Sequence, residues 1–294
     1  MEKLFYLCIF LLIAESSYAL GPDYRDYLVV NQPMSYALII KKESSLSTLM
    51  FNSKNNSNST KINYHKLQFE FYPMLLSNGK KSYTTFSFGY NEEYLGESQD
   101  TQLAGNYSGA YLSFYSIAEI NATWNWNTYF SYGAYSEEPV KHSTKSEKYL
   151  AHVNFSYMPD KWKSFKFGGL ANSNFGNGQF LPVLGMSYSW GKVIADVLLP
   201  FYLDLRIIHH PNFHTLLTSS LSTSSHYDHN KKDALEISGI NSGVQWEYKF
   251  YSYTWLQVGM YYTGEKELVW LSSDTIAGRI ESGYSFSIGV IVRT

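Results

Sequence analysis

The sequence predicts an all-β protein, a transmembrane antiparallel up-and-down β-barrel of about fourteen strands, with twelve as the other count. Three observations predict it. Many segments alternate aromatic or aliphatic residues with polar ones, the connections between them alternate between long and short, and the chain begins with a secretion signal.

The first nineteen residues have the features of a signal peptide. Lys3 precedes an apolar run over residues 4–14, which is shorter than the roughly 20 residues that span a bilayer as a helix. Ser17 and Ala19 are the small residues that a signal peptidase reads, so we expect cleavage after Ala19; a retained anchor is the alternative. Cys8, the one cysteine, lies in this run. The mature chain therefore has no disulfide, which suits a bacterial envelope protein.

Composition argues against a nucleic-acid-binding protein but does not distinguish a membrane barrel from a soluble β-sandwich. Aromatic residues make up 18% of the chain and charged residues 16%. Removing the signal takes one of 23 basic and two of 25 acidic residues, leaving 22 and 23 and a net charge of -1. This balance gives no basic excess for nucleic acid. A large soluble β-sandwich would have a similar composition.

The clearest alternation lies in residues 121–135. Trp124, Trp126, Phe130 and Tyr132 share one parity, while Asn, Ser and Thr dominate the other, and a period of two indicates a strand. Similar patterns predict strands at 34–42, 62–72, 82–90, 110–118, 121–135, 147–158, 163–173, 180–190, 193–199, 202–209, 213–223, 236–249, 253–263 and 282–293. Most approach the roughly 9–11 residues that cross a membrane. Pro200 could mark a bulge instead of a break.

The connections favour a barrel over a sandwich. Long polar connections at 43–61, 91–109, 135–146, 224–235 and 264–281 alternate with short ones at 73–81, 119–120, 159–162, 191–192, 210–212 and 250–252. Residues 174–179 and 200–201 are the exceptions. Short periplasmic turns and longer outer loops produce this asymmetry. We therefore assign residues 20–33 to a short periplasmic lead and 34–294 to the barrel, with both ends at the short-turn rim.

A β-sheet that spans a lipid bilayer must close into a barrel, because each unpaired backbone group in lipid costs several kcal/mol. Aromatic residues near strand ends are candidates for the interfacial girdles of such a barrel. They are Tyr72, Tyr90, Tyr157, Trp162, Trp190, Trp246, Tyr248 and Tyr262. Packing at the edge of a soluble sheet is the alternative.

If the aromatic parity contacts lipid, the opposite parity lines the lumen. That parity carries Lys66, Gln68, Glu70, His152, Lys166, Asp196, Asp204, Arg206, Gln245 and Glu247. Asp196, Asp204 and Arg206 fall on adjacent strands and could form an ion-pair group. Such a group could select solutes by charge, but mutual bracing of the barrel is the favoured interpretation.

No catalytic, metal or cofactor site is predicted. His209, His210 and His214 flank a turn, and His226, Asp228, His229 and Asp233 lie in a long loop, without a strong ligand spacing. A membrane hydrolase would need a nucleophile and a base. His142 and Ser143 are the nearest pair, and adjacent loop residues seldom act together in that way.

The stretch 180–206, with Leu181-Pro182-Val183-Leu184-Gly185 followed by Tyr188 and Trp190, resembles uncharacterised bacterial outer-membrane β-barrel proteins grouped as a domain of unknown function. The resemblance implies a barrel in the outer membrane of a Gram-negative bacterium and no particular activity. Our first hypothesis is a passive channel or transporter for small solutes. The alternative is a structural or surface-interaction barrel with a plugged lumen and functional outer loops. The expected partners are outer-membrane lipid, the barrel assembly machinery and a small solute, with no nucleic acid.

Overall fold

The computed structural model describes residues 36–45, 49–53, 59–77, 82–96, 105–136, 147–160, 162–174, 177–228, 232–270 and 275–293. Fourteen strands form its wall. They are β1 (Tyr36–Ser45), β3 (Ser59–Ser77), β4 (Ser82–Gly96), β5 (Gly105–Asn121), β6 (Trp124–Ser136), β7 (Glu147–Asp160), β8 (Lys163–Asn174), β9 (Asn177–Trp190), β10 (Val193–Leu199), β11 (Tyr202–His210), β12 (Phe213–Asp228), β13 (Asp233–Tyr251), β14 (Thr254–Thr263) and β17 (Gly283–Arg293). The predicted signal peptide 1–19 and lead 20–33 lie outside the described residues.

The wall closes on itself. Each strand pairs antiparallel with the next, and β1 completes the ring by pairing with β3 on one side and β17 on the other. Ile39, for example, lies opposite Glu70 of β3 and Ile291 of β17. This ring confirms both the predicted fold class and the count of fourteen.

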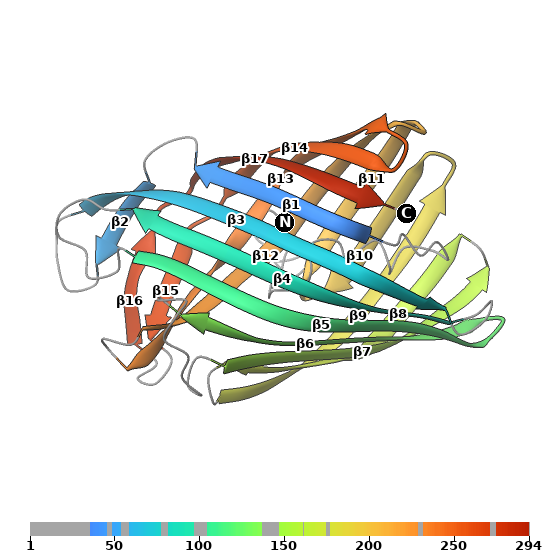
Figure 1. Cartoon of the computed structure of the whole chain (residues 1–294), viewed down its shortest axis with the longest axis horizontal. Helices are drawn as coiled ribbons and strands as arrows, with labels where there is room; N and C mark the ends of the chain where they lie inside the picture. The colour runs from blue at the N-terminus through green and yellow to red at the C-terminus, as the bar shows by residue number, and fades with distance from the viewer. Residues whose placement is uncertain are drawn as a thin grey trace, which may run out of the picture.

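Three further strands were not predicted, because each is too short for its alternation to stand out in the sequence. They are β2 (Leu49–Ser53), β15 (Lys266–Trp270) and β16 (Thr275–Ile280), within the predicted loops 43–61 and 264–281. They pair in the order β13, β15, β16, β2, β3, and so continue the wall beyond the ends of β14, β17 and β1. Figure 1 shows them gathered at one end of the barrel.

Side chains alternate between two environments along each strand. In β7, Tyr149, Val153 and Phe155 are exposed, whereas Leu150, His152 and Asn154 are buried. The exposed parity carries the large apolar residues through most of the wall, which is the reverse of a soluble protein. The barrel therefore presents an apolar outer surface and a largely polar interior.

The two rims differ as the connections predicted. Turns at 122–123, 191–192, 211–212 and 252–253 join strands at the short-turn rim. The opposite, long-loop rim carries the connections 97–104 and 137–146, the extra strands, and two exceptions, 175–176 and 200–201. Pro200 lies in the second exception, in a two-residue turn after a cis Leu199–Pro200 peptide bond, and not in a bulge.

Among the described residues, no helix has the length and apolar character needed to cross a membrane.

Candidate functional site: the barrel lumen

Lys166 and Asp196 form a buried ion pair in the lumen. The Lys166 ammonium of β8 lies 2.6 Å from Asp196 Oδ1 of β10, and both side chains are almost fully buried. Ser187 donates to the same oxygen at 2.7 Å, and the Tyr202 hydroxyl donates to Oδ2 at 2.9 Å. Asp204 lies opposite Asp196 on β11 and also attracts Lys166. The Asp196 carboxylate thus joins four neighbouring strands, β8 to β11.

A second charged group lies along β11 to β14. Arg206 Nη1 is 3.5 Å from Glu247 Oε2, and His214 Nδ1 is 3.8 Å from the same oxygen. Gln257 donates to Glu247 Oε1 at 2.8 Å and Gln245 does so at 3.0 Å. The three residues predicted to form one ion-pair group thus contribute to two groups: Asp196 pairs with Lys166 of β8, and Arg206 pairs with Glu247 of β13. Charges of both signs compensate each other within it.

Glu70 is fully buried on β3 and accepts hydrogen bonds from two neighbouring strands. Ser87 of β4 donates at 2.7 Å and Tyr111 of β5 at 3.3 Å. Tyr111 can lie flat against the wall because position 89 is glycine: a Cβ there would stand 1.9 Å from its ring. His152, only 1% exposed, lies opposite Tyr129 of β6 and Leu170 of β8.

One contact crosses the lumen instead of following the wall. His226 of β12 places Nε2 3.0 Å from Glu93 Oε2 of β4, although β4 and β12 are far apart in the ring. The imidazole of His226 also packs against the rings of Tyr107 and Tyr135, at centroid distances of 5.0 and 6.4 Å. Tyr227 pairs in parallel with Ser136 of β6. We call His226 and these five residues the cross-lumen bridge.

The cross-lumen bridge continues into a basic cluster at the long-loop rim. Lys66 Nζ lies 2.9 Å from Glu93 Oε1, so Lys66 and His226 contact the two oxygens of the same carboxylate. Lys266 of β15 lies 4.2 Å from the Tyr64 ring centroid. Burial lowers the pKa of Lys266, and Glu43 and Glu93 partly oppose this effect by attracting its charged form. The bridge thus rests on a packed, compensated set of charges.

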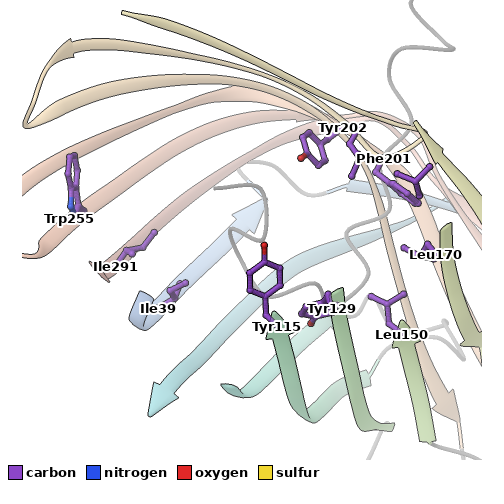
Figure 2. Packing of buried hydrophobic residues seen from close by; sticks show 11 residues of the cluster. Ile39, Tyr115, Tyr129, Leu150, Leu170, Phe201, Tyr202, Trp255 and Ile291 are labelled. Atoms are coloured by element: carbon purple, nitrogen blue, oxygen red, sulfur yellow. The ribbon is translucent and has the colours of Figure 1, made fainter. Parts of the chain in front are cut away.

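Buried apolar side chains form two clusters in the interior. One contiguous cluster combines Ile39, Tyr115, Tyr129, Leu150, Leu170, Val183, Leu198, Phe201, Tyr202, Trp255 and Ile291. Figure 2 shows these side chains projecting from strands on opposite sides of the barrel. A second, smaller cluster holds Tyr64, Tyr107, Leu235, Ile237, Leu268 and Ile280 near the long-loop rim.

Most girdle candidates lie on the outer surface. Tyr157, Trp162, Trp190, Trp246, Tyr248 and Tyr262 are exposed. Tyr90 is half-buried, and the side chain of Tyr72 lies outside the described part of the chain. Membership of a lipid-interface girdle stays a prediction for all of them.

No contact between Glu93 and His226 was predicted, because the predicted strand 82–90 ends at Tyr90 and His226 lies in a predicted loop. Glu93 has the same parity as the polar residues Ser87 and Asn91, so a longer predicted strand would have placed it on the lumen side. The apolar cluster was not predicted either. The stretch Leu198-Leu199-Pro200-Phe201 could have indicated it, because apolar residues on both parities of a strand indicate that both faces are buried.

The histidine groups considered as metal ligands are dispersed. His209 bonds Thr215 at 2.9 Å, His214 faces Glu247, and His226 belongs to the cross-lumen bridge. The parts of the chain that the structure describes hold no group of three His, Cys, Asp or Glu side chains placed for a metal ion. His142, Ser143 and His229 lie outside those parts.

No protein-family model and no curated protein matches the chain, so the resemblance over residues 180–206 stays a prediction. Solved structures match the chain over most of its length. The translocator domain of the autotransporter NalP from Neisseria meningitidis has a TM-score of 0.41 and 11% identity, covering 90% of this chain and 91% of that one. The toluene transporter TodX of P. putida has a TM-score of 0.39 and 7% identity, covering 90% and 91%. The β domain of the Bordetella autotransporter BrkA has a TM-score of 0.37 and 12% identity, covering 87% and 98%.

Proposed function

We propose that the protein is an outer-membrane barrel of a Gram-negative bacterium that serves as a passive channel or transporter for small solutes. The observation that carries this proposal is the closed wall with its two faces. Leu112, Phe88 and Leu184, each more than half exposed, belong to an apolar exterior that only lipid would cover favourably. Ionised and amide side chains line the inside, where a solute would pass.

The long-loop rim, in this proposal, faces outward and the short-turn rim faces the periplasm. Lys166, Asp196, Arg206 and Glu247 then lie along the solute path. Because their charges compensate each other, we expect weak discrimination between cations and anions. The barrel assembly machinery is the expected insertion partner.

The cross-lumen bridge predicts a narrow passage. His226 contacts Glu93 of a strand on the other side of the ring, so its side chain lies across the axial path. Replacing it in His226→Ala removes the ring and leaves the Lys66–Glu93 pair in place. We expect a low conductance for the native barrel in planar bilayers and a higher conductance for this variant.

His209→Ala is the matched control, since His209 is an exposed histidine near the short-turn rim that contacts Thr215 and Phe213. Its conductance should stay at the native value. Both proteins must first migrate as heat-modifiable bands and fractionate with the outer membrane. Recovery as a freely soluble periplasmic protein would refute the placement.

A structural or surface-interaction barrel is the second candidate, and the bridge is the observation that favours it. A lumen spanned by His226 and packed with apolar side chains could simply be closed. If native protein and His226→Ala were both well folded and electrically silent, this second function would replace the first.

A further inference from the structure

The barrel narrows at the long-loop rim to a smaller closed ring of strands. Pairing between β11 and β12 ends at Tyr202 and Ser220, and beyond that point β12 reaches β6, where Tyr227 pairs with Ser136. On its other side β13 pairs with β15, and the pairing continues through β16 and β2 to β3. We call this set the upper ring: β2, β3, β4, β5, β6, β12, β13, β15 and β16.

The upper ring has one weak joint, which lies between β6 and β12. A single residue pair joins these two strands, whereas every residue of β12 from Phe213 to Asp228 is paired with β13. Residues 222–228 of β12 and 233–240 of β13 therefore form one unit, which we call the upper hairpin. This unit could leave β6 after the loss of one backbone pairing, while the ladder between β12 and β13 stays intact.

Polar contacts hold the upper hairpin on the side of the joint. His226 Nε2 of the cross-lumen bridge lies 3.0 Å from Glu93 Oε2. Glu236 of β13 attracts the ammonium group of Lys148, which belongs to β7. Water can replace contacts of this kind, so their loss costs much less than their strength in an apolar interior.

Apolar contacts hold the upper hairpin on the opposite side. Its Leu235 and Ile237 belong to the second apolar cluster, which includes residues of β15 and β16 but none of β6. The ladder between β13 and β15 lies on this side as well. Because apolar contacts favour burial and polar ones tolerate water, the fold places the anchor of the hairpin at β15 and the separable contact at β6.

The closed joint leaves polar atoms without partners. Within the described chain, the buried Nδ1 of His226 and the buried Oδ1 of Asn91 have no hydrogen-bond partner. Asn91 lies beside Gly109, which is opposite Tyr135 of the cross-lumen bridge. A buried polar atom without a partner costs free energy, and contact with water would recover it. Separation at this joint therefore gains hydrogen bonds as well as losing them.

We infer that the upper hairpin is a gate: it opens the long-loop end of the lumen by separating from β6, and the His226–Glu93 contact holds it shut. This inference rests on the proposed channel function and adds its moving element. The buried arrangement of the cross-lumen bridge is then the closed state. The low conductance expected of the native barrel reflects rare opening of the joint.

A disulfide across the joint tests the gate. Cys8, in the predicted signal peptide, is the one native cysteine, so the thiols of Ser136→Cys/Tyr227→Cys can pair only with each other in the mature chain. Neighbouring strands lie about 4.8 Å apart, and a disulfide joins Cα atoms about 4.4–6.8 Å apart. In planar bilayers the oxidised double variant should stay closed, and dithiothreitol should restore its openings.

Ser219→Cys/Ser242→Cys is the matched control. The two native hydroxyl oxygens lie 2.6 Å apart on β12 and β13, so this disulfide joins strands that move together and leaves the joint with β6 free. Its conductance should be the same before and after reduction. Tyr227→Cys alone, measured in parallel, accounts for the loss of the tyrosine ring.

Thiol labelling measures the opening without any current. Tyr227 is only 5% exposed, so in folded Tyr227→Cys a water-soluble maleimide should react only when the joint opens. Adding Glu93→Gln weakens the contact with His226 and should raise the labelling rate about tenfold. Adding Glu247→Gln, which alters an equally buried carboxylate in the wall, should leave the rate unchanged.

The outcomes separate the gate from the channel function. If the oxidised joint variant conducted as well as its reduced form, or if Glu93→Gln and Glu247→Gln were labelled at equal rates, the gate would be refuted and a conducting barrel would remain a channel. A heat-modifiable barrel that never conducts, whether oxidised or reduced, would overturn both.

Discussion

Removing Lys166 should destabilise the barrel more than removing its partner. In Lys166→Met, Asp196 keeps the Ser187 and Tyr202 hydroxyls but loses its counter-charge. Asp196 and Asp204 then face each other on paired strands with no cation from β8 between them. Asp196→Asn, in contrast, leaves Lys166 with the attraction of Asp204.

The magnitude follows from burial. Breaking a buried ion pair by removing one partner costs about 3–5 kcal/mol, and both side chains here are at most 3% exposed. Like charges that are directly opposite on paired strands add to this cost. We expect about 4 kcal/mol for Lys166→Met and about 2 kcal/mol for Asp196→Asn, which keeps some hydrogen bonds. The double variant should recover about 1–3 kcal/mol relative to the sum of the two.

Urea unfolding of the barrel in lipid vesicles, followed by tryptophan fluorescence and by gel migration, measures these differences. Equal slopes in urea would show that the unfolded states are comparable. If Lys166→Met cost less than about 1 kcal/mol, or if the double variant equalled the sum of the single ones, the pair would not be the buried, coupled unit that the structure shows.

Three further predictions concern other parts of the wall. Leu112→Arg, on the exposed apolar face, should cost about 2–4 kcal/mol in vesicles, whereas Asn106→Arg, near the long-loop end of the same strand, should cost about 0–1; equal values would contradict lipid contact at Leu112. Gly89→Ala should displace Tyr111 from Glu70 and lower the urea midpoint of unfolding, because a Cβ at position 89 would stand 1.9 Å from the Tyr111 ring. Gly264→Ala is the control and should change the midpoint little, because the nearest atom to a Cβ there is a backbone oxygen at 3.4 Å. Arg279→Ala should change stability by less than about 1 kcal/mol, because its ion pairs with Glu265 and Glu267 are about half exposed; a larger loss in urea titration would show that this rim is more rigid than its exposure implies.

The sequence predicted the wall because lipid imposes a two-residue period over long stretches. Trp126, Phe130 and Tyr132 share a parity, and all three are exposed on the outer face of β6. The same period indicated that Glu70 and Asp196 belong to the opposite parity, which is the buried side. Loop lengths likewise predicted the two rims, because short turns and long loops are visible directly in the chain.

Contacts between distant strands could not be predicted in this way. Periodicity gives the face of a side chain but not the strand across the lumen, so His226 and Glu93, 133 residues apart, gave no sign of meeting. The partner of Asp196 was equally hidden, because Lys166 reaches it only through the stagger of β8, β9 and β10.

The sequence by itself thus determined the class of fold, a count of twelve or fourteen wall strands and the parity that meets the outside, since these depend on local alternation and on connection lengths. Only the tertiary structure decided between those two counts, which charges pair and where the lumen is bridged. These features depend on strand ends, register and curvature, which are set when the ring closes and brings residues far apart in the chain together.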